Sequence, residues 1–183
     1  MSRLSGTIME TCQDIPAPHQ LQLFTAMGEL LASLHMWPLA STHALRRARP
    51  VEDTYRAYRE EVLHAHRPEH TLLQQAAEQM QRLATSLPPA TTVCLVHRDF
   101  SQRNLLVTPT GAQWAIMGLT DFEKGCLGDL MEDLAMVVFK ECVEQPPRKH
   151  AFLEAYRLTK PLAACASERL SYHLYGLLFE IAL

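Results

Sequence analysis

The sequence predicts an α+β domain that is mainly helical, with a small β element near its centre. Apolar residues recur at three- and four-residue spacing through most of the chain, which is the period of an amphipathic helix. Short apolar runs between residues 93 and 119 are separated by polar and glycine-containing turns, as short strands are. The 183 residues suit one domain with its own core, and we expect no second full domain.

Three helices are predicted before the β element and three after it. The first helix follows a loop with two prolines, and its apolar face contains Leu21, Phe24, Met27, Leu30, Leu31 and Leu34. Proline-containing segments end the next two helices and separate the following two. The expected helices are His19–His35, Val51–Arg67, Thr71–Leu87, Asp129–Phe139, His150–Leu158 and Glu168–Leu183. A short strand is expected at Leu4–Glu10, with no earlier segment to pair with it.

Composition excludes several classes of protein. The net charge is −3 and no long basic block is present, so we do not expect nucleic-acid binding. The five cysteines are widely spaced, without a Cys-x-x-Cys motif, and they predict neither a zinc site nor a disulfide framework. No apolar run approaches the roughly 20 residues that span a bilayer. Together with the lack of a secretory leader pattern, these features favour a cytoplasmic protein that does not bind membranes.

The polar stretch His97–Asn104 lies between two apolar runs. Val93–Val96 precedes it and Leu105–Val107 follows it, which predicts strand, loop and strand. The compact turn Thr108–Gly111 then predicts a β-hairpin with Trp114–Met117. Polar side chains are therefore collected on one loop, and Asp121 joins them seventeen positions after Asn104.

Three of these residues suit phosphoryl transfer. Asn104 and Asp121 offer the oxygen ligands that Mg²⁺ selects, usually beside substrate phosphates. Asp99 would accept or orient the proton of an incoming hydroxyl. A single Asp or Asn on a loop is, however, most often a turn residue bonded to its own backbone. For His97 we expect a structural support of the loop.

The order of these residues matches a known signature. His97-Arg98-Asp99, Asn104 and Asp121-Phe122 follow the pattern of the protein-kinase catalytic and metal-binding motifs. Glu123, however, replaces the glycine of the protein-kinase motif, and a Gly-Asp-x-x-x-Asp-Leu-Ala motif, residues 128–135, follows without room for an activation loop. The run from residue 95 to 135 therefore resembles the aminoglycoside phosphotransferase and choline kinase-like family. Leu130 replaces that family's usual proline.

The resemblance implies a fold and a set of roles. The fold would be the C-terminal lobe of a protein kinase-like fold, with helices around a small β-hairpin that carries the catalytic loop. Asp99 would be the catalytic base, and Asn104 and Asp121 would bind Mg²⁺ and ATP. Residues 1–11 resemble the hinge strand, where the backbone of Met9 and Glu10 would meet adenine. ATP and Mg²⁺ are thus the expected cofactors.

The same resemblance divides the chain. It implies a hinge strand (1–11), a helical part (18–90), a catalytic loop with a metal-binding hairpin (93–123) and C-terminal helices (129–183). A kinase N-terminal lobe carries a Gly-rich loop and a strand lysine. Here no lysine precedes Lys124, and only Gly6 and Gly28 precede Gly111. We expect the N-terminal ATP-binding lobe to be absent from this chain. That lobe would then be a missing partner, and the chain alone would be weakly active or inactive.

The expected function is transfer of the γ-phosphoryl group of ATP to a hydroxyl of a small molecule, such as an aminoglycoside, a choline-like compound or a sugar. The alternative is a non-catalytic, kinase-derived scaffold or interaction module. Asp129 and Asp133 are expected to brace the loop or cap a helix. Glu123 would face the metal site, bind a substrate or pair with Lys124. Acidic residues such as Glu60 and Glu61 suit either a cationic acceptor or a solvated helix face.

Overall fold

The computed structural model describes residues 5–38, 51–64, 70–88 and 93–182. The fold is α+β and mainly helical, as predicted. The helices are α1 (Ala17–His35), α2 (Val51–His64), α3 (His70–Ser86), α4 (Leu130–Cys142), α5 (Pro146–Thr159) and α6 (Ala166–Ala182). The strands are β1 (Thr7–Ile8), β2 (Val93–Val96), β3 (Leu105–Thr110), β4 (Gln113–Leu119) and β5 (Cys126–Asp129). Short 3₁₀ turns are η1 (Met9–Thr11), η3 (Gln102–Asn104) and η4 (Phe122–Lys124).

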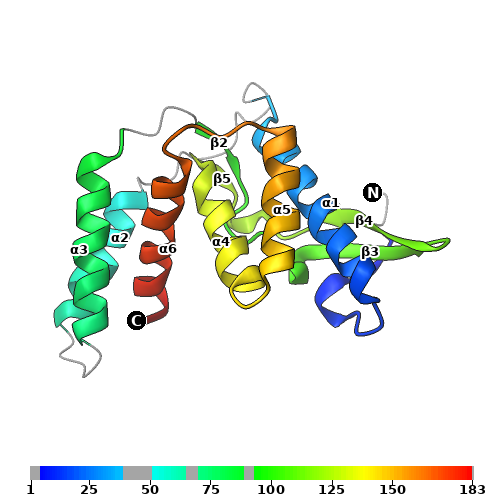
Figure 1. Cartoon of the computed structure of the whole chain (residues 1–183), viewed down its shortest axis with the longest axis horizontal. Coiled ribbons are helices and arrows are strands. Elements are labelled where there is room, and N and C mark those ends of the chain that lie inside the picture. The colour runs from blue at the N-terminus through cyan, green and yellow to red at the C-terminus, as the bar shows by residue number, and fades with distance from the viewer. Residues whose placement is uncertain (1–4, 39–50, 65–69, 89–92, 183) are drawn as a thin grey trace.

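The elements form an elongated arrangement. The β3–β4 hairpin projects at one end of the molecule, and α2, α3 and α6 stand together at the other (Figure 1). Helices α1, α4 and α5 lie between them, with β2 and β5 beside α4 (Figure 1). The predicted ends of the second and last helices, Arg67 and Leu183, fall outside the described residues. None of the helices in the described ranges has the length and hydropathy that crossing a membrane requires.

The first strand pairs with a segment that comes later in the chain. Strand β1 runs antiparallel to β3, with Thr7 opposite Val107 and Ile8 opposite Leu106. This partner follows β1 by about a hundred residues, so local sequence patterns do not indicate the pairing. The β3–β4 hairpin is as predicted, and Gly111 adopts a φ of 64° in its turn, a conformation that suits glycine.

A second sheet was not predicted. Strand β5 pairs antiparallel with β2, so that Cys94 lies opposite Gly128 and Val93 opposite Asp129. The four residues of β5 include a glycine and an aspartate, which are both uncommon in strands. Long-range pairing with β2 therefore decides the conformation. As a consequence, α4 begins directly beside the strand that leads into the polar loop.

The boundary of α5 also differs from the prediction. Pro146 and Pro147 predict a break in the chain, with the next helix beginning at His150. The helix instead begins at Pro146. Proline is tolerated in the first turn, because the backbone N–H groups there have no partner within the helix.

Two clusters of buried side chains form the core. The larger joins α1, α4 and α5 to the strands and includes Phe24, Leu134, Phe152 and Tyr156. The smaller joins α2, α3 and α6 and includes Tyr55, Val62, Met80 and Phe179. The side chains of Tyr58 and Leu63, also on α2, lie outside the described set. The smaller cluster thus gives the α2–α3–α6 group a core of its own.

Gly28 allows α1 and α5 to approach each other closely. A Cβ atom at this position would lie 2.3 Å from the carbonyl oxygen of Phe152 and 3.0 Å from the backbone nitrogen of Tyr156. Both atoms belong to the backbone of α5, which cannot turn aside as a flexible side chain does. Even one methyl group would therefore force the two helices apart.

We predict that Gly28→Ala lowers the free energy of unfolding by about 2 kcal/mol, because overpacking outweighs the gain in helix propensity. Urea denaturation followed by circular dichroism measures the effect. Glu29→Ala, at an exposed position of the same helix, is the control and should change stability little. Equal stability of Gly28→Ala and wild type would show that the contact between the helices is not tight.

Candidate active site

The carboxylate of Asp133 holds the predicted catalytic loop in place. It is fully buried at the start of α4. Its Oδ2 atom accepts a hydrogen bond from the backbone N–H of His97, and its Oδ1 atom accepts one from that of Arg98, both at 2.7 Å. The His35 ring of α1 lies 3.1 Å from Oδ2. One carboxylate therefore joins α1, α4 and the loop, which is the bracing role predicted for Asp133.

Two details show why the loop needs this support. Arg98 adopts a φ of 64°, in the left-handed region that is costly for a residue with a side chain. Its guanidinium Nε lies 3.1 Å from Oε2 of Glu132 on α4. Because both its backbone and its side chain are held from α4, Arg98 keeps a conformation that an isolated loop would leave.

His97 is a structural residue, as predicted. The backbone N–H of Asp99 donates to Nδ1 of the ring at 3.3 Å, so Nδ1 is an acceptor. Nε2 then carries the proton and donates to the carbonyl oxygen of Thr120 at 2.9 Å. The ring is fully buried, and the centroid of the Phe122 ring lies 4.5 Å away. His97 thus ties the loop to the segment that carries Asp121.

Two cations hold the carboxylate of Asp99. Nη2 of Arg103 lies 2.7 Å from Oδ1 and 2.9 Å from Oδ2, and Nζ of Lys140 lies 3.3 Å from Oδ1. Burial opposes ionisation of Asp99, but these hydrogen bonds and charges outweigh it and lower the pKa of the carboxyl below its ordinary value. Neither Arg103 nor Lys140 was singled out from the sequence. Asp99 is therefore a weak base that stays ionised near neutral pH.

Asn104 and Asp121 are brought together by the open end of the hairpin. The side-chain amide of Asn104 donates to the carbonyl oxygen of Asp99 at 2.8 Å, which leaves the amide oxygen available. The backbone N–H and hydroxyl of Thr120 both donate to the carbonyl oxygen of Asn104, at 2.9 and 3.1 Å. Asp121, the next residue, is exposed, with a φ of 63°. Among the described residues it has no hydrogen-bond or ion-pair partner.

These two side chains fit a Mg²⁺ site. Both present oxygen atoms that other described groups leave unused, and oxygen ligands are what Mg²⁺ prefers. Mg²⁺ is usually bound by one or two protein groups together with water and phosphate oxygens. The described residues contain no cluster of three or more His, Cys, Asp or Glu side chains that would form a metal site without a substrate.

The segment with Met9 and Glu10 lies beside the same loop, because η1 contacts η3. The side chain of Met9 is buried in the core and that of Glu10 is exposed, so the backbone of these residues is what η1 offers a nucleotide. Arg103, which the sequence did not single out, lies near the predicted site residues. Its pKa is raised first by the hydrogen bond and charge of Asp99, and further by the charges of Glu10 and Asp121.

Of the other acidic residues singled out from the sequence, the side chain of Asp129 has defined polar contacts within the described part of the chain and that of Glu123 does not. Asp129 is the N-cap of α4: its Oδ1 accepts the backbone N–H of Met131, and Glu132 completes the capping box. The predicted capping role is therefore confirmed. Its Oδ2 lies 3.0 Å from Nη1 of Arg169. Glu123 is exposed in η4, and its role stays open between the three predicted alternatives.

A pocket of about 320 Å³ opens beside Asp99, between the loop, η4 and helices α2, α4 and α6. It is lined by Tyr55, Arg98, Asp99, Lys124, Glu132, Met136, Lys140, Leu177 and Glu180. Glu60 and Glu61, which the sequence offered for a cationic acceptor, are exposed on α2 and do not line it. The pocket residues come from five separate segments, so no local motif marks them.

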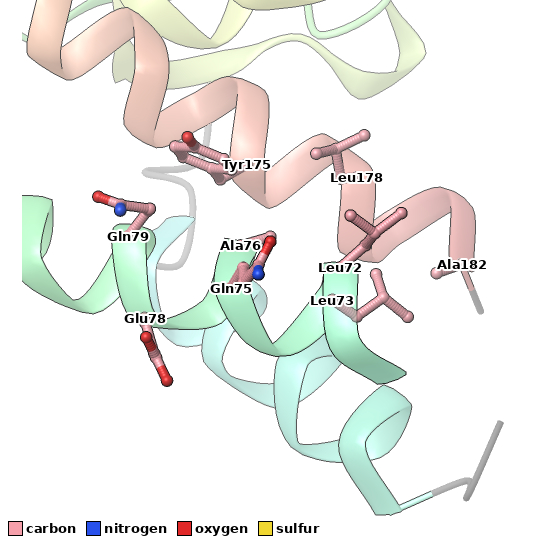
Figure 2. A pocket seen from close by; sticks show the side chains of 9 residues that line it. All are labelled: Leu72, Leu73, Gln75, Ala76, Glu78, Gln79, Tyr175, Leu178 and Ala182. Atoms are coloured by element: carbon pink, nitrogen blue, oxygen red, sulfur yellow. The ribbon is translucent and has the colours of Figure 1, made fainter. Parts of the chain in front are cut away.

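A larger pocket of about 960 Å³ lies elsewhere, between α3 and α6. Figure 2 shows Tyr175 and Leu178 of α6 on one side, with Leu72 and Ala76 of α3 on the other. It contains none of the predicted site residues, and most of its surface is apolar. The larger pocket therefore lacks the convergent polar groups that surround Asp99, and the smaller pocket is the candidate reaction site.

We predict that Asp133→Asn lowers the free energy of unfolding by ~3 kcal/mol, because an amide cannot accept both backbone hydrogen bonds and the His35 contact. Chemical denaturation measures the loss. Glu144→Gln, at an exposed position after the same helix, is the matched control and should stay within ~0.5 kcal/mol of wild type. A cost no larger than that of the control would contradict the bracing role.

We also predict that Arg103→Gln raises the pKa of Asp99, because it removes the cation that favours the ionised form. Carbon-detected NMR of the carboxyl group measures the pKa. The sign for stability follows: ionised Asp99 stabilises the fold at pH above its unfolded pKa, and this contribution is lost as pH falls through the lower folded pKa. In Arg103→Gln the folded pKa of Asp99 should lie closer to the unfolded pKa, so this stabilisation should be lost over a narrower pH range. Arg82→Gln, on α3, is the control and should leave the range unchanged. An unchanged pKa would show that Arg103 does not set it.

Comparison with solved structures supports the fold. The GDP complex of aminoglycoside 2'-phosphotransferase-IIIa has a TM-score of 0.70 and 15% identity, with 98% of this chain and 60% of that chain covered. Spectinomycin phosphotransferase in complex with ADP and spectinomycin has a TM-score of 0.59 and 16% identity, with 98% of this chain and 57% of that chain covered. A microcompartment-associated aminopropanol kinase has a TM-score of 0.61 and 23% identity, with 88% of this chain and 53% of that chain covered. This chain thus spans between 53% and 60% of their length.

These solved structures establish a protein kinase-like fold, as the motifs predicted. No curated protein sequence matches the chain significantly. A family model described as the phosphotransferase enzyme family, however, matches residues 1–167. That match covers the loop, the hairpin and all the residues proposed for chemistry, and the chain therefore belongs to the phosphotransferase enzyme family.

Proposed function

We propose that the chain carries the reaction site of a small-molecule kinase, which transfers the γ-phosphoryl group of ATP to a hydroxyl group. The observation that supports this most is the position of Asp99. Asp99 lines the 320 Å³ pocket, and its backbone carbonyl accepts a hydrogen bond from the side-chain amide of Asn104. Thr120, which precedes Asp121, donates in turn to the carbonyl oxygen of Asn104. One loop thus connects an acceptor pocket to a pair of oxygen ligands.

Asp99 would mainly orient the acceptor. Its ionised carboxylate accepts a hydrogen bond from the hydroxyl and directs the oxygen at phosphorus. Phosphoryl transfer passes through a loose transition state, so the hydroxyl needs little activation before the new bond forms. A carboxylate of lowered pKa therefore suffices, because the proton becomes acidic only as the oxygen bonds to phosphorus.

The nucleotide would bind on the other side of the loop. The amide oxygen of Asn104 and the carboxylate of Asp121 would hold Mg²⁺, which would supply positive charge against the phosphates of ATP. The backbone of Met9 and Glu10 would contact adenine, as the family resemblance implies. Arg103 lies close to this region and already balances the charge of Asp99.

The acceptor class follows the solved relatives in outline. They are named as an aminoglycoside phosphotransferase, a spectinomycin phosphotransferase and an aminopropanol kinase, so a hydroxyl of a small polar molecule is the expected target, and aminoglycosides, choline-like compounds and sugars belong in the acceptor panel. The sequence lacks a lysine before Lys124 and a Gly-rich loop, which in kinases contact the phosphates. We therefore expect turnover by this chain alone to be low.

Nucleotide binding and turnover test the proposal separately. Calorimetry with ATP and Mg²⁺ should show Mg²⁺-dependent binding that Asn104→Ala weakens, because an oxygen ligand is lost. Asp99→Asn should keep this binding and lower any turnover of the acceptor panel by about 10²- to 10⁴-fold. Glu144→Gln serves as the control for both assays. Absence of ATP binding in a folded chain would favour the scaffold alternative.

A further inference from the structure

The pocket beside Asp99 has a balanced set of charges. Three cations, Arg98, Lys124 and Lys140, line it together with three anions, Asp99, Glu132 and Glu180. The loop, η4, α4 and α6 all contribute charged groups. A pocket built for a polycation would carry an excess of carboxylates, because each like-charged neighbour repels the ligand.

Four of these charges are engaged in ion pairs within the pocket, and Asp99 is also bound by Arg103, a cation that does not line the pocket. Arg98 pairs with Glu132 at 3.1 Å, and Lys140 pairs with Asp99 at 3.3 Å. Lys124 and Glu180 have no ion-pair partner among the described residues, and both are exposed. The pocket therefore presents one cation from η4 and one anion from α6 that are free to meet a ligand.

The volume limits the size of that ligand. About 320 Å³ is at the lower end of the range for small-molecule pockets, roughly 300 to 1,000 Å³. Met136 and Leu177 give the pocket an apolar side between the charged groups. A compact molecule with a short carbon skeleton fits this lining, whereas a multi-ring amino sugar would extend outside it.

We propose that the acceptor is a compact zwitterionic alcohol, of the hydroxy amino acid class, with its carboxylate at Lys124, its ammonium group at Glu180 and its hydroxyl at Asp99. This inference rests on the proposed function for the hydroxyl end alone. In the reaction, the hydroxyl oxygen forms a bond to the γ-phosphorus of ATP as the bond from that phosphorus to the β–γ bridging oxygen breaks. ADP leaves, and the hydroxyl proton passes to Asp99 and then to water.

Three ligands with one skeleton separate the two charges. L-threonine carries both, 1-amino-2-propanol is threonine without the carboxylate, and 3-hydroxybutyrate is threonine without the ammonium group. Saturation-transfer NMR and calorimetry on the full chain, without nucleotide, measure their binding. Threonine should bind about tenfold more tightly than either single-charge analogue, since each lost charge-assisted hydrogen bond costs roughly that factor. Kanamycin, a polycationic amino sugar, should bind more weakly than threonine.

Two variants test which pocket residue binds each charged group of the ligand. Lys124→Ala should weaken threonine and 3-hydroxybutyrate by about three- to tenfold and leave 1-amino-2-propanol unchanged. Glu180→Gln should weaken threonine and 1-amino-2-propanol and leave 3-hydroxybutyrate unchanged. Both positions are exposed, so neither variant should prevent folding, and Lys149→Ala on α5 is the matched surface control.

Three results would overturn the inference: kanamycin binding more tightly than threonine, a ligand order that neither variant changes, or no binding of any of the three analogues. The proposed function fails by a different observation. Mg²⁺-dependent ATP binding that Asn104→Ala weakens would preserve the kinase proposal even if the zwitterion idea is wrong. Conversely, threonine binding that depends on Lys124 and Glu180, without ATP binding, would preserve the ligand class and reject the reaction.

Discussion

The buried carboxylate of Asp133 is the constraint on which the site depends. A charge in the interior is costly unless hydrogen bonds compensate it, and here two backbone N–H groups and a histidine ring do so. The same bonds fix the chain at His97 and Arg98, which lie immediately before Asp99. Because α4 also supplies Glu132 to Arg98 and Lys140 to Asp99, one helix sets both the shape and the electrostatics of the loop.

The pairing of Asp99 with two cations changes what its carboxylate is suited to do. Arg103 and Lys140 lower its pKa, so that it is a poor acceptor of a proton from an ordinary alcohol. A strongly basic residue would be needed if the hydroxyl had to ionise before attack. A loose transition state removes that need. The lowered pKa and the two cations therefore fit the proposed role of Asp99, which is to orient the acceptor.

Local patterns predicted the helices, the hairpin and the family, because these depend on periodicity, turns and a contiguous motif. They missed the features that depend on distant segments. Strand β5 forms because β2 lies beside it, and β1 finds its partner in β3. Lys140 reaches Asp99 from 41 residues away, and Glu180 joins the pocket from α6. Arg103 was within the motif, but its role appears only when the loop folds its guanidinium back onto Asp99.

The charge balance around Asp99 links the electrostatics of the loop to the choice of acceptor. A polycationic ligand would compete with Arg103 and Lys140 for the carboxylate of Asp99, and would meet the cations Lys124 and Arg98 in the pocket lining. A ligand with one positive and one negative group has no such conflict, since Glu180 and Lys124 provide a partner for each. In the proposed complex the hydroxyl would reach Asp99 while its two cations stay in place, so ligand recognition would not disturb the carboxylate proposed to orient the acceptor.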